Sequence, residues 1–216
     1  MSRIAISGQL VAAVILLLLC GVSHAQSDAK NGSATKATGS AAKGSATKGS
    51  DSKKSGPAQQ FDVADGQLKF SAPGAWKKIQ PKFDFYHAEF NIPKADGDEK
   101  EGRITFSQVG GSIDQNLDRW EGQFVDIDTA NEEHVKKEKA TISGLNVQMI
   151  RIAGTFQDGA GPFAPKTKRA DYVLIGAAIE MEKGANVYIK SYGPKKTMAA
   201  NAKVIKEMIK AMKVVD

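Results

Sequence analysis

Several short segments of this 216-residue chain have residue types and spacings that could support binding or catalysis. Gly110-Gly111-Ser112 precedes an expected helix, where backbone amides at the N-terminus could hold a phosphate. However, no Walker lysine follows, Ser112 can act as the N-cap, and Asp114 in the first turn would repel an anion. We therefore interpret this segment as a helix start rather than as a phosphate site.

Histidine and carboxylate side chains are the candidates for metal binding and acid–base chemistry. Beyond residue 25 the only histidines are His87 and His134, and neither lies in an HExxH or HxH arrangement. Acidic clusters occur at residues 96–101 and 126–133, but their glycine and glutamate positions do not fit an EF-hand loop. We predict that the chain carries no metal ion and no other cofactor.

Two segments have the composition of partner-binding surfaces. Lys203, Lys206 and Lys210 line one face of an expected C-terminal helix, which either is simply solvated or docks an acidic partner. The connection over residues 157–169 is long and holds Phe163 between two prolines. Phe163 either closes the edge of the core or anchors a partner.

The sequence contains none of the common catalytic signatures. GxSxG, Walker and Rossmann motifs are absent, and Cys20 is the only cysteine. We expect a non-enzymatic binding or accessory module with no catalytic residues and with Phe163, Lys203, Lys206 and Lys210 as partner contacts. The alternative is a hydrolase of envelope polymers that uses carboxylates near residues 157–169.

The residues before position 59 predict export rather than a folded structure. Arg3, an apolar run over residues 10–19 and Ser23-His24-Ala25 are typical of a signal peptide cleaved after Ala25. A retained membrane anchor and lipidation of Cys20 are the alternatives. We expect a periplasmic or extracellular protein that contains no cysteine after cleavage.

Residues 26–58 have the composition of a disordered linker. Between Ser27 and Pro57 there is no apolar residue larger than Ala, so nothing there can offset the entropy lost on ordering. The net charge of +6 lies mainly in this region, because Arg3 and six linker lysines face only two aspartates before residue 59. We therefore expect no specific nucleic-acid binding, but the linker lysines could contact an anionic envelope surface.

The periodicity of residues 59–216 predicts a single α+β domain with an antiparallel sheet flanked by helices. A capping box of Ser112 and Gln115 opens a helix over residues 113–124, and a second helix covers residues 195–213. Alternation places Tyr86 on the same face of its strand as Ala88. The expected strands cover residues 67–70, 83–92, 104–108, 139–142, 145–156, 172–180 and 187–192.

Three of these features resemble the Mog1/PsbP-like proteins. They are the opening FSAPGAW at residues 70–76, the helix carrying Trp120, and the ending YIKSYGPK at residues 188–195 before a C-terminal helix. The resemblance covers residues 61–215 and implies the same fold. That superfamily includes a Ran-binding nuclear transport factor and photosystem accessory proteins, so the resemblance implies a binding or assembly role. No residue signature for either partner is present here.

Overall fold

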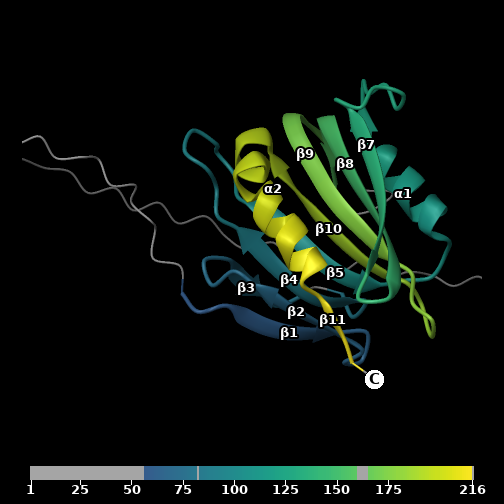
Figure 1. Cartoon of the computed structure of the whole chain (residues 1–216). Coiled ribbons are helices and arrows are strands. Elements are labelled where there is room, and N and C mark those ends of the chain that lie inside the picture. The colour runs from purple at the N-terminus through teal and green to yellow at the C-terminus, as the bar shows by residue number, and fades with distance from the viewer. Residues whose placement is uncertain (1–55, 82, 160–164, 216) are drawn as a thin grey trace, which may run out of the picture. The chain divides into compact units, whose positions relative to one another are not determined.

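The computed structural model describes residues 56–81, 83–159 and 165–215 (Figure 1). The predicted signal peptide, most of the predicted linker and Phe163 lie outside these residues. Within the described part of the chain, no helix combines the length and the apolar character needed to cross a membrane.

The described residues form an eight-stranded antiparallel sheet with two helices, which confirms the predicted α+β fold class. Along most of the sheet the strand order is β3, β4, β5, β10, β9, β8, β6, and β7 pairs with β8 beside β6. The strand bounds are β3 (Lys77–Ile79), β4 (Tyr86–Ile92), β5 (Gly102–Gln108), β6 (Phe124–Val125), β7 (Val135–Ile142), β8 (Leu145–Asp158), β9 (Thr167–Ile179) and β10 (Val187–Pro194).

One face of this sheet is closed by a second, smaller sheet and by α2 (Lys195–Lys210). The small sheet joins β1 (Gln59–Val63), β2 (Leu68–Ala72) and β11 (Lys213–Val214). Phe61 lies 4.7 Å from Phe106 and 5.2 Å from Phe90, measured between ring centroids. Ile205 and Ile209 of α2 are fully buried in the same cluster. Figure 1 shows α2 crossing the near face of the sheet.

The opposite face is covered only in part, by α1 (Ile113–Glu121). The capping box of Ser112 and Gln115 forms as predicted, and Gly122 ends the helix. Leu117 and Trp120 pack into a core cluster that is formed mainly by β8 and β9. Nine helical residues span only about 13 Å, so α1 cannot cover the neighbouring surface of β4, β5 and β10 as well.

The first turn of α2 is stabilised by a residue from a distant loop. Pro194 at the N-cap position offers no side-chain hydrogen bond. Instead Asp98, in the turn between β4 and β5, accepts hydrogen bonds from the backbone N–H of Thr197 at 2.7 Å and from its hydroxyl at 2.6 Å. These bonds hold the pKa of Asp98 below its usual value, and a carboxylate at this position complements the helix dipole.

Several predicted boundaries differ from the structure. The first helix ends at Glu121 instead of residue 124, because Gly122 terminates it and Phe124 begins β6. The last helix ends at Lys210, and Lys213 belongs to β11. β1, β3, β6 and β11 were not predicted, and β7 begins at residue 135 rather than 139.

The predicted connection over residues 157–169 is shorter than expected, because β8 continues to Asp158 and β9 begins at Thr167. Asp158 pairs with Thr167 at this end of the ladder. The apolar stripes of the two helical segments are buried at Leu117, Trp120, Ile205 and Ile209, whereas Ile113 is only partly buried.

Candidate functional site

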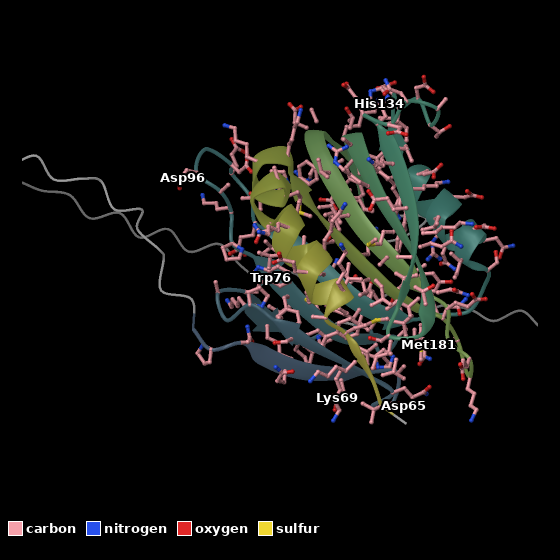
Figure 2. The ribbon with its side chains drawn as sticks, viewed as in Figure 1. Asp65, Lys69, Trp76, Asp96, His134 and Met181 are labelled. Carbon is pink, nitrogen blue, oxygen red and sulfur yellow. The ribbon has the colours of Figure 1, made fainter. Side chains whose placement is uncertain are left out.

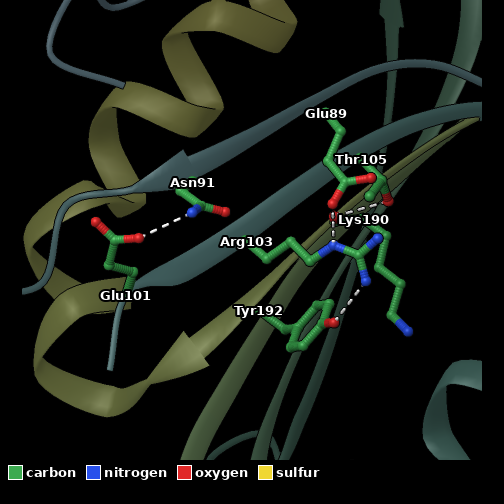
Figure 3. Close-up of polar contacts among 7 residues, drawn as sticks. All are labelled: Glu89, Asn91, Glu101, Arg103, Thr105, Lys190 and Tyr192. Carbon is green, nitrogen blue, oxygen red and sulfur yellow. Dashed lines mark hydrogen bonds and ion pairs between the residues drawn. The ribbon is translucent and has the colours of Figure 1, made fainter. Parts of the chain in front are cut away.

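The part of the sheet that α1 leaves uncovered carries a row of polar side chains (Figure 3). The antiparallel register places Glu89 of β4 opposite Thr105 of β5, and Thr105 opposite Lys190 of β10. Residues paired in this way share one face of the sheet. In the adjacent row Arg103 lies opposite Tyr192. Three strands therefore present these side chains on one surface.

A β-bulge adds Tyr86 to this surface. The register shifts between Tyr86 and Ala88, so that Tyr86 pairs with Ser107 while Ala88 pairs with Phe106. The predicted placement of Tyr86 beside Ala88 is therefore wrong, because one extra residue in a strand reverses the side-chain alternation. The guanidinium carbon of Arg103 lies 5.7 Å from the centroid of the Tyr86 ring.

Arg103 forms the centre of the hydrogen-bond network. Its Nε donates to Oε1 of Glu89 at 2.6 Å, and its Nη1 donates to the hydroxyl of Tyr192 at 3.1 Å. Burial alone would lower the pKa of Arg103, but the bond to Glu89 and the nearby Tyr192 raise it overall. Glu89 is only 4% exposed, and its Oε2 has no hydrogen-bond partner among the described residues. A buried carboxylate oxygen without a partner is costly, which makes it a candidate ligand contact.

Lys190 is the second cation on this surface. Its Nζ donates to Oε1 of Gln123 at 2.5 Å and lies over the rings of Tyr192 and Phe156. Burial, together with the positive charges of Arg119 and Arg103, lowers the pKa of Lys190 to about 7. The ammonium and the neutral amine are therefore both populated near neutral pH.

These residues line a groove, which we call the sheet groove. A cavity of about 290 Å³ lies where α1 meets the sheet and is lined by Arg119, Thr105, Ser107 and Lys190, among others. It shares five lining residues with a wider hollow of about 810 Å³ that reaches Arg103, Glu89 and Asp158. Phe83 and Phe85 form the rim, 50% and 45% exposed, with their rings stacked 5.3 Å apart.

The predicted partner-binding lysines lie elsewhere. Lys203, Lys206 and Lys210 are on α2, on the opposite side of the sheet, and the structure does not bring them to the sheet groove. Lys203 pairs with Glu207 at 3.7 Å, and Lys206 lies 3.4 Å from a carboxylate oxygen of Glu138 on β7. Their role in binding therefore stays a prediction.

His134 contacts the backbone of the second acidic cluster, not its carboxylates. Nδ1 of His134 accepts a hydrogen bond from the backbone N–H of Asp128. Figure 2 shows His134 and Asp96 at separate ends of the molecule. Among residues 56–81, 83–159 and 165–215, no three His, Cys, Asp or Glu side chains lie close enough together to hold a metal ion.

Two carboxylates near residues 157–169 line the sheet groove, as the hydrolase alternative requires. Each is already bonded to an arginine. Glu89 bonds to Arg103 at 2.6 Å, and Asp158 bonds to Nε of Arg169 at 2.7 Å. Both carboxylates are therefore ion-paired with an arginine.

Sequence reasoning missed the residues of the sheet groove. Glu89, Arg103 and Lys190 are separated by up to about a hundred residues, and each occupies the ordinary polar position of an alternating strand. One pattern could have indicated them. Tyr188, Lys190 and Tyr192 alternate along β10, so that one face of a strand next to the sheet centre combines aromatic rings with a lysine.

Comparisons with known proteins yield solved structures but no family model and no curated relative. The chain is similar to a cyanobacterial PsbP from Synechocystis, with 8% identity, a TM-score of 0.46, and coverage of 78% of this chain and 99% of that one. It is also similar to a mutant of Mog1, with 14% identity, a TM-score of 0.42, and coverage of 74% and 96%. A Pseudomonas aeruginosa protein of unknown function gives 12% identity, a TM-score of 0.39, and coverage of 74% and 98%. These likenesses are to the Mog1/PsbP-like fold that the sequence resembles, and they concern the fold alone.

Proposed function

We propose that the chain is a non-enzymatic binding or accessory module whose sheet groove holds a protein partner. The observation that carries this proposal is the stacked pair of Phe83 and Phe85, about half exposed at the rim of a groove with a charged floor. Grouped apolar rings on a protein surface commonly mark an interaction site. The open sheet surface beside α1 provides the space for a partner.

The lining indicates the chemistry of the partner. The rings of Phe83 and Phe85 suit an apolar or aromatic side chain, and the cation Lys190 suits an acidic one. The unpartnered oxygen of Glu89 would accept a hydrogen bond from an N–H group. We therefore propose a partner segment that carries an aromatic residue close to an acidic residue. The nearly neutral charge beyond residue 58 does not favour a nucleic acid.

We also propose that the protein is exported to the periplasm or the extracellular space and that residues 26–58 tether the domain there. The support is the composition of residues 1–25 and of the Lys/Ser/Gly-rich segment that follows. Mass spectrometry of the protein isolated from its cells should find Gln26 at the N-terminus. An intact N-terminal segment would favour the retained anchor instead.

Peptide binding tests the groove. We would titrate the isolated protein with twelve-residue peptides that contain Trp or Phe next to Glu, and with versions in which Lys replaces Glu. The Glu peptides should bind more tightly than the Lys peptides. Phe85→Ser should weaken binding by about tenfold or more, as expected for a central aromatic contact. Val204→Ser is the matched control, because Val204 is a 36% exposed apolar residue on α2.

Three results would contradict this proposal. Equal loss in Phe85→Ser and Val204→Ser would show that neither residue is a specific contact. Loss of binding in Lys203→Ala or Lys210→Ala, with Phe85→Ser unchanged, would move the partner surface to α2. Hydrolysis of an envelope polymer that Glu89→Gln abolishes would favour the hydrolase alternative.

A further inference from the structure

Among the residues that the structure describes, Lys190 forms no ion pair with a carboxylate. None of the ion pairs among the described residues includes it. Its Nζ has one hydrogen bond, to Gln123, and lies 5.0 Å and 5.6 Å from the centroids of the Tyr192 and Phe156 rings. An ammonium group has three N–H donors. Donors therefore remain for a ligand that enters the groove.

Arg119 brings a second cation to the same cavity from α1. Its Nη2 donates to Oδ1 of Asn116 at 2.5 Å, which leaves most of its N–H groups available. The hydroxyls of Thr105 and Ser107 also line this cavity. Their hydrogen bonds to backbone carbonyl oxygens are long, 3.4 and 3.5 Å, so both hydroxyls can turn toward a ligand at little cost.

The charges around Lys190 leave a positive surplus. Glu89 is bonded to Arg103 and Asp158 is bonded to Arg169, so both carboxylates are already neutralised by an arginine. The titratable and charged groups that face Lys190 are Tyr86 and Glu89 of β4, Arg103 of β5, Arg119 of α1, Asp158 of β8, Arg169 of β9, and Tyr188 and Tyr192 of β10. Lys190 and Arg119 are the cations that lack an opposite charge.

We infer that Lys190 and Arg119, together with the hydroxyls of Thr105 and Ser107, form a site for an oxyanion such as a carboxylate, and that the oxyanion enters with a proton taken up by Lys190. The inference rests on the proposed function in one respect, that the partner supplies this carboxylate. The depressed pKa of Lys190 is consistent with the site: an anion next to Nζ supplies the missing opposite charge and favours the ammonium form.

Calorimetry with small anions tests the site without the partner. We would titrate the isolated protein with sodium acetate and with sodium sulfate, both fully ionised from pH 6 to pH 8, in two buffers that differ in ionisation enthalpy. With a free pKa of about 7, each bound anion should take up about nine-tenths of a proton at pH 8 and about one-tenth at pH 6. The affinity should be about tenfold weaker at pH 8 than at pH 6.

Variants at position 190 distinguish the effect of the positive charge on anion affinity from the uptake of a proton. Lys190→Arg should bind the anions without proton uptake, because arginine stays charged throughout this pH range. Lys190→Met should lose about tenfold or more in affinity, because the central opposite charge is gone. Lys203→Met on α2 is the control and should bind as the wild type does. If Lys190→Met does not fold, the wild-type proton uptake and the Lys190→Arg result still decide the question.

The inference is overturned if neither anion binds, if binding takes up no proton at pH 8, or if Lys203→Met loses as much affinity as Lys190→Met. Failure of the proposed function would look different. Proton-coupled anion binding together with peptides that do not bind would leave the oxyanion site in place and remove the protein partner. Peptides that bind through Phe85 without proton uptake would remove only the oxyanion site.

Discussion

The contact between α1 and the sheet can be tested at Gly176 of β9. A Cβ atom added at Gly176 would lie 2.4 Å from Cζ3 of Trp120 and 3.0 Å from its Cε3. Trp120 is 3% exposed and packs edge-on against Tyr188, with ring centroids 6.1 Å apart, so the indole has little room to move. Gly176→Ala should therefore force α1 away from the sheet.

Two opposing effects set the size of the change. Overpacking of a rigid core contact costs about 1 to 3 kcal/mol. Replacing Gly by Ala also restricts the unfolded chain, which stabilises a protein by about 0.4 to 1 kcal/mol where the conformation is compatible. We expect Gly176→Ala to lower the free energy of unfolding by roughly 1 to 2 kcal/mol, because the steric effect dominates. Gly110→Ala is the control, since no atom lies within 4 Å of its added Cβ, and it should change stability by less than about 0.5 kcal/mol.

A double-mutant cycle measured by urea denaturation gives the sharper test. Trp120→Ala alone should cost about 3 to 5 kcal/mol. In that background Gly176→Ala should cost nothing or stabilise the protein, because the clash is gone and the new methyl group fills part of the cavity. The coupling between the two sites should then exceed about 1 kcal/mol. Additive effects, or a Gly176→Ala variant as stable as the wild type, would show that Trp120 does not lie on Gly176. In that case α1 would not hold Arg119 over the sheet groove.

Three further predictions concern stability. Asp98→Asn should lower the melting temperature at pH 7, because the hydrogen bonds from Thr197 depress the pKa of Asp98 in the folded state. The difference from the wild type should shrink as the pH falls below about 4 and vanish once the pH is below the folded-state pKa of Asp98. The pKa of Lys190 is about 7 in the folded state and 10.5 in the unfolded chain. Between pH 7 and pH 10.5 the unfolded chain therefore binds more protons than the folded protein. The free energy of unfolding should rise across this pH range by roughly 2 to 5 kcal/mol. Urea denaturation across this pH range should show that rise, and Lys190→Met should lack it. Ile209→Ala should cost about 2 to 5 kcal/mol, whereas Lys206→Ala, which loses one surface ion pair, should cost less than about 0.5 kcal/mol by the same denaturation assay.

Local sequence patterns predicted the start of α1 but not its end. Ser112 and Gln115 specify the capping box through side chains only three residues apart. At the other end, Phe124 keeps the helical spacing after Trp120 although it belongs to β6. A buried aromatic residue fits either element, so the spacing alone could not locate the boundary. Gly122 was the local indication that the helix stops.

The candidate site was beyond sequence reasoning for a different reason. It depends on which strands are neighbours and in what register, and the pairing of β5 with β10 joins segments about eighty residues apart. The bulge that turns Tyr86 toward Arg103 could not be predicted either, because it does not change the alternation of apolar and polar residues in the sequence. The lysines of α2 were predicted as partner contacts because they are close together in sequence, whereas Arg103 and Lys190 come together only in the folded chain.

The pairing of β11 with β2 has a consequence for how the chain reaches its folded state. Lys213 is the partner of Lys69, which lies 144 residues earlier in the chain. The small sheet therefore cannot be completed until residues 213 and 214 have left the ribosome, and α2 must also be released before the core beneath it closes. Contacts this distant in sequence slow folding because a large loop must close before they form. A growing chain would thus remain open until β11 has emerged, a condition in which it could still be threaded through a narrow pore.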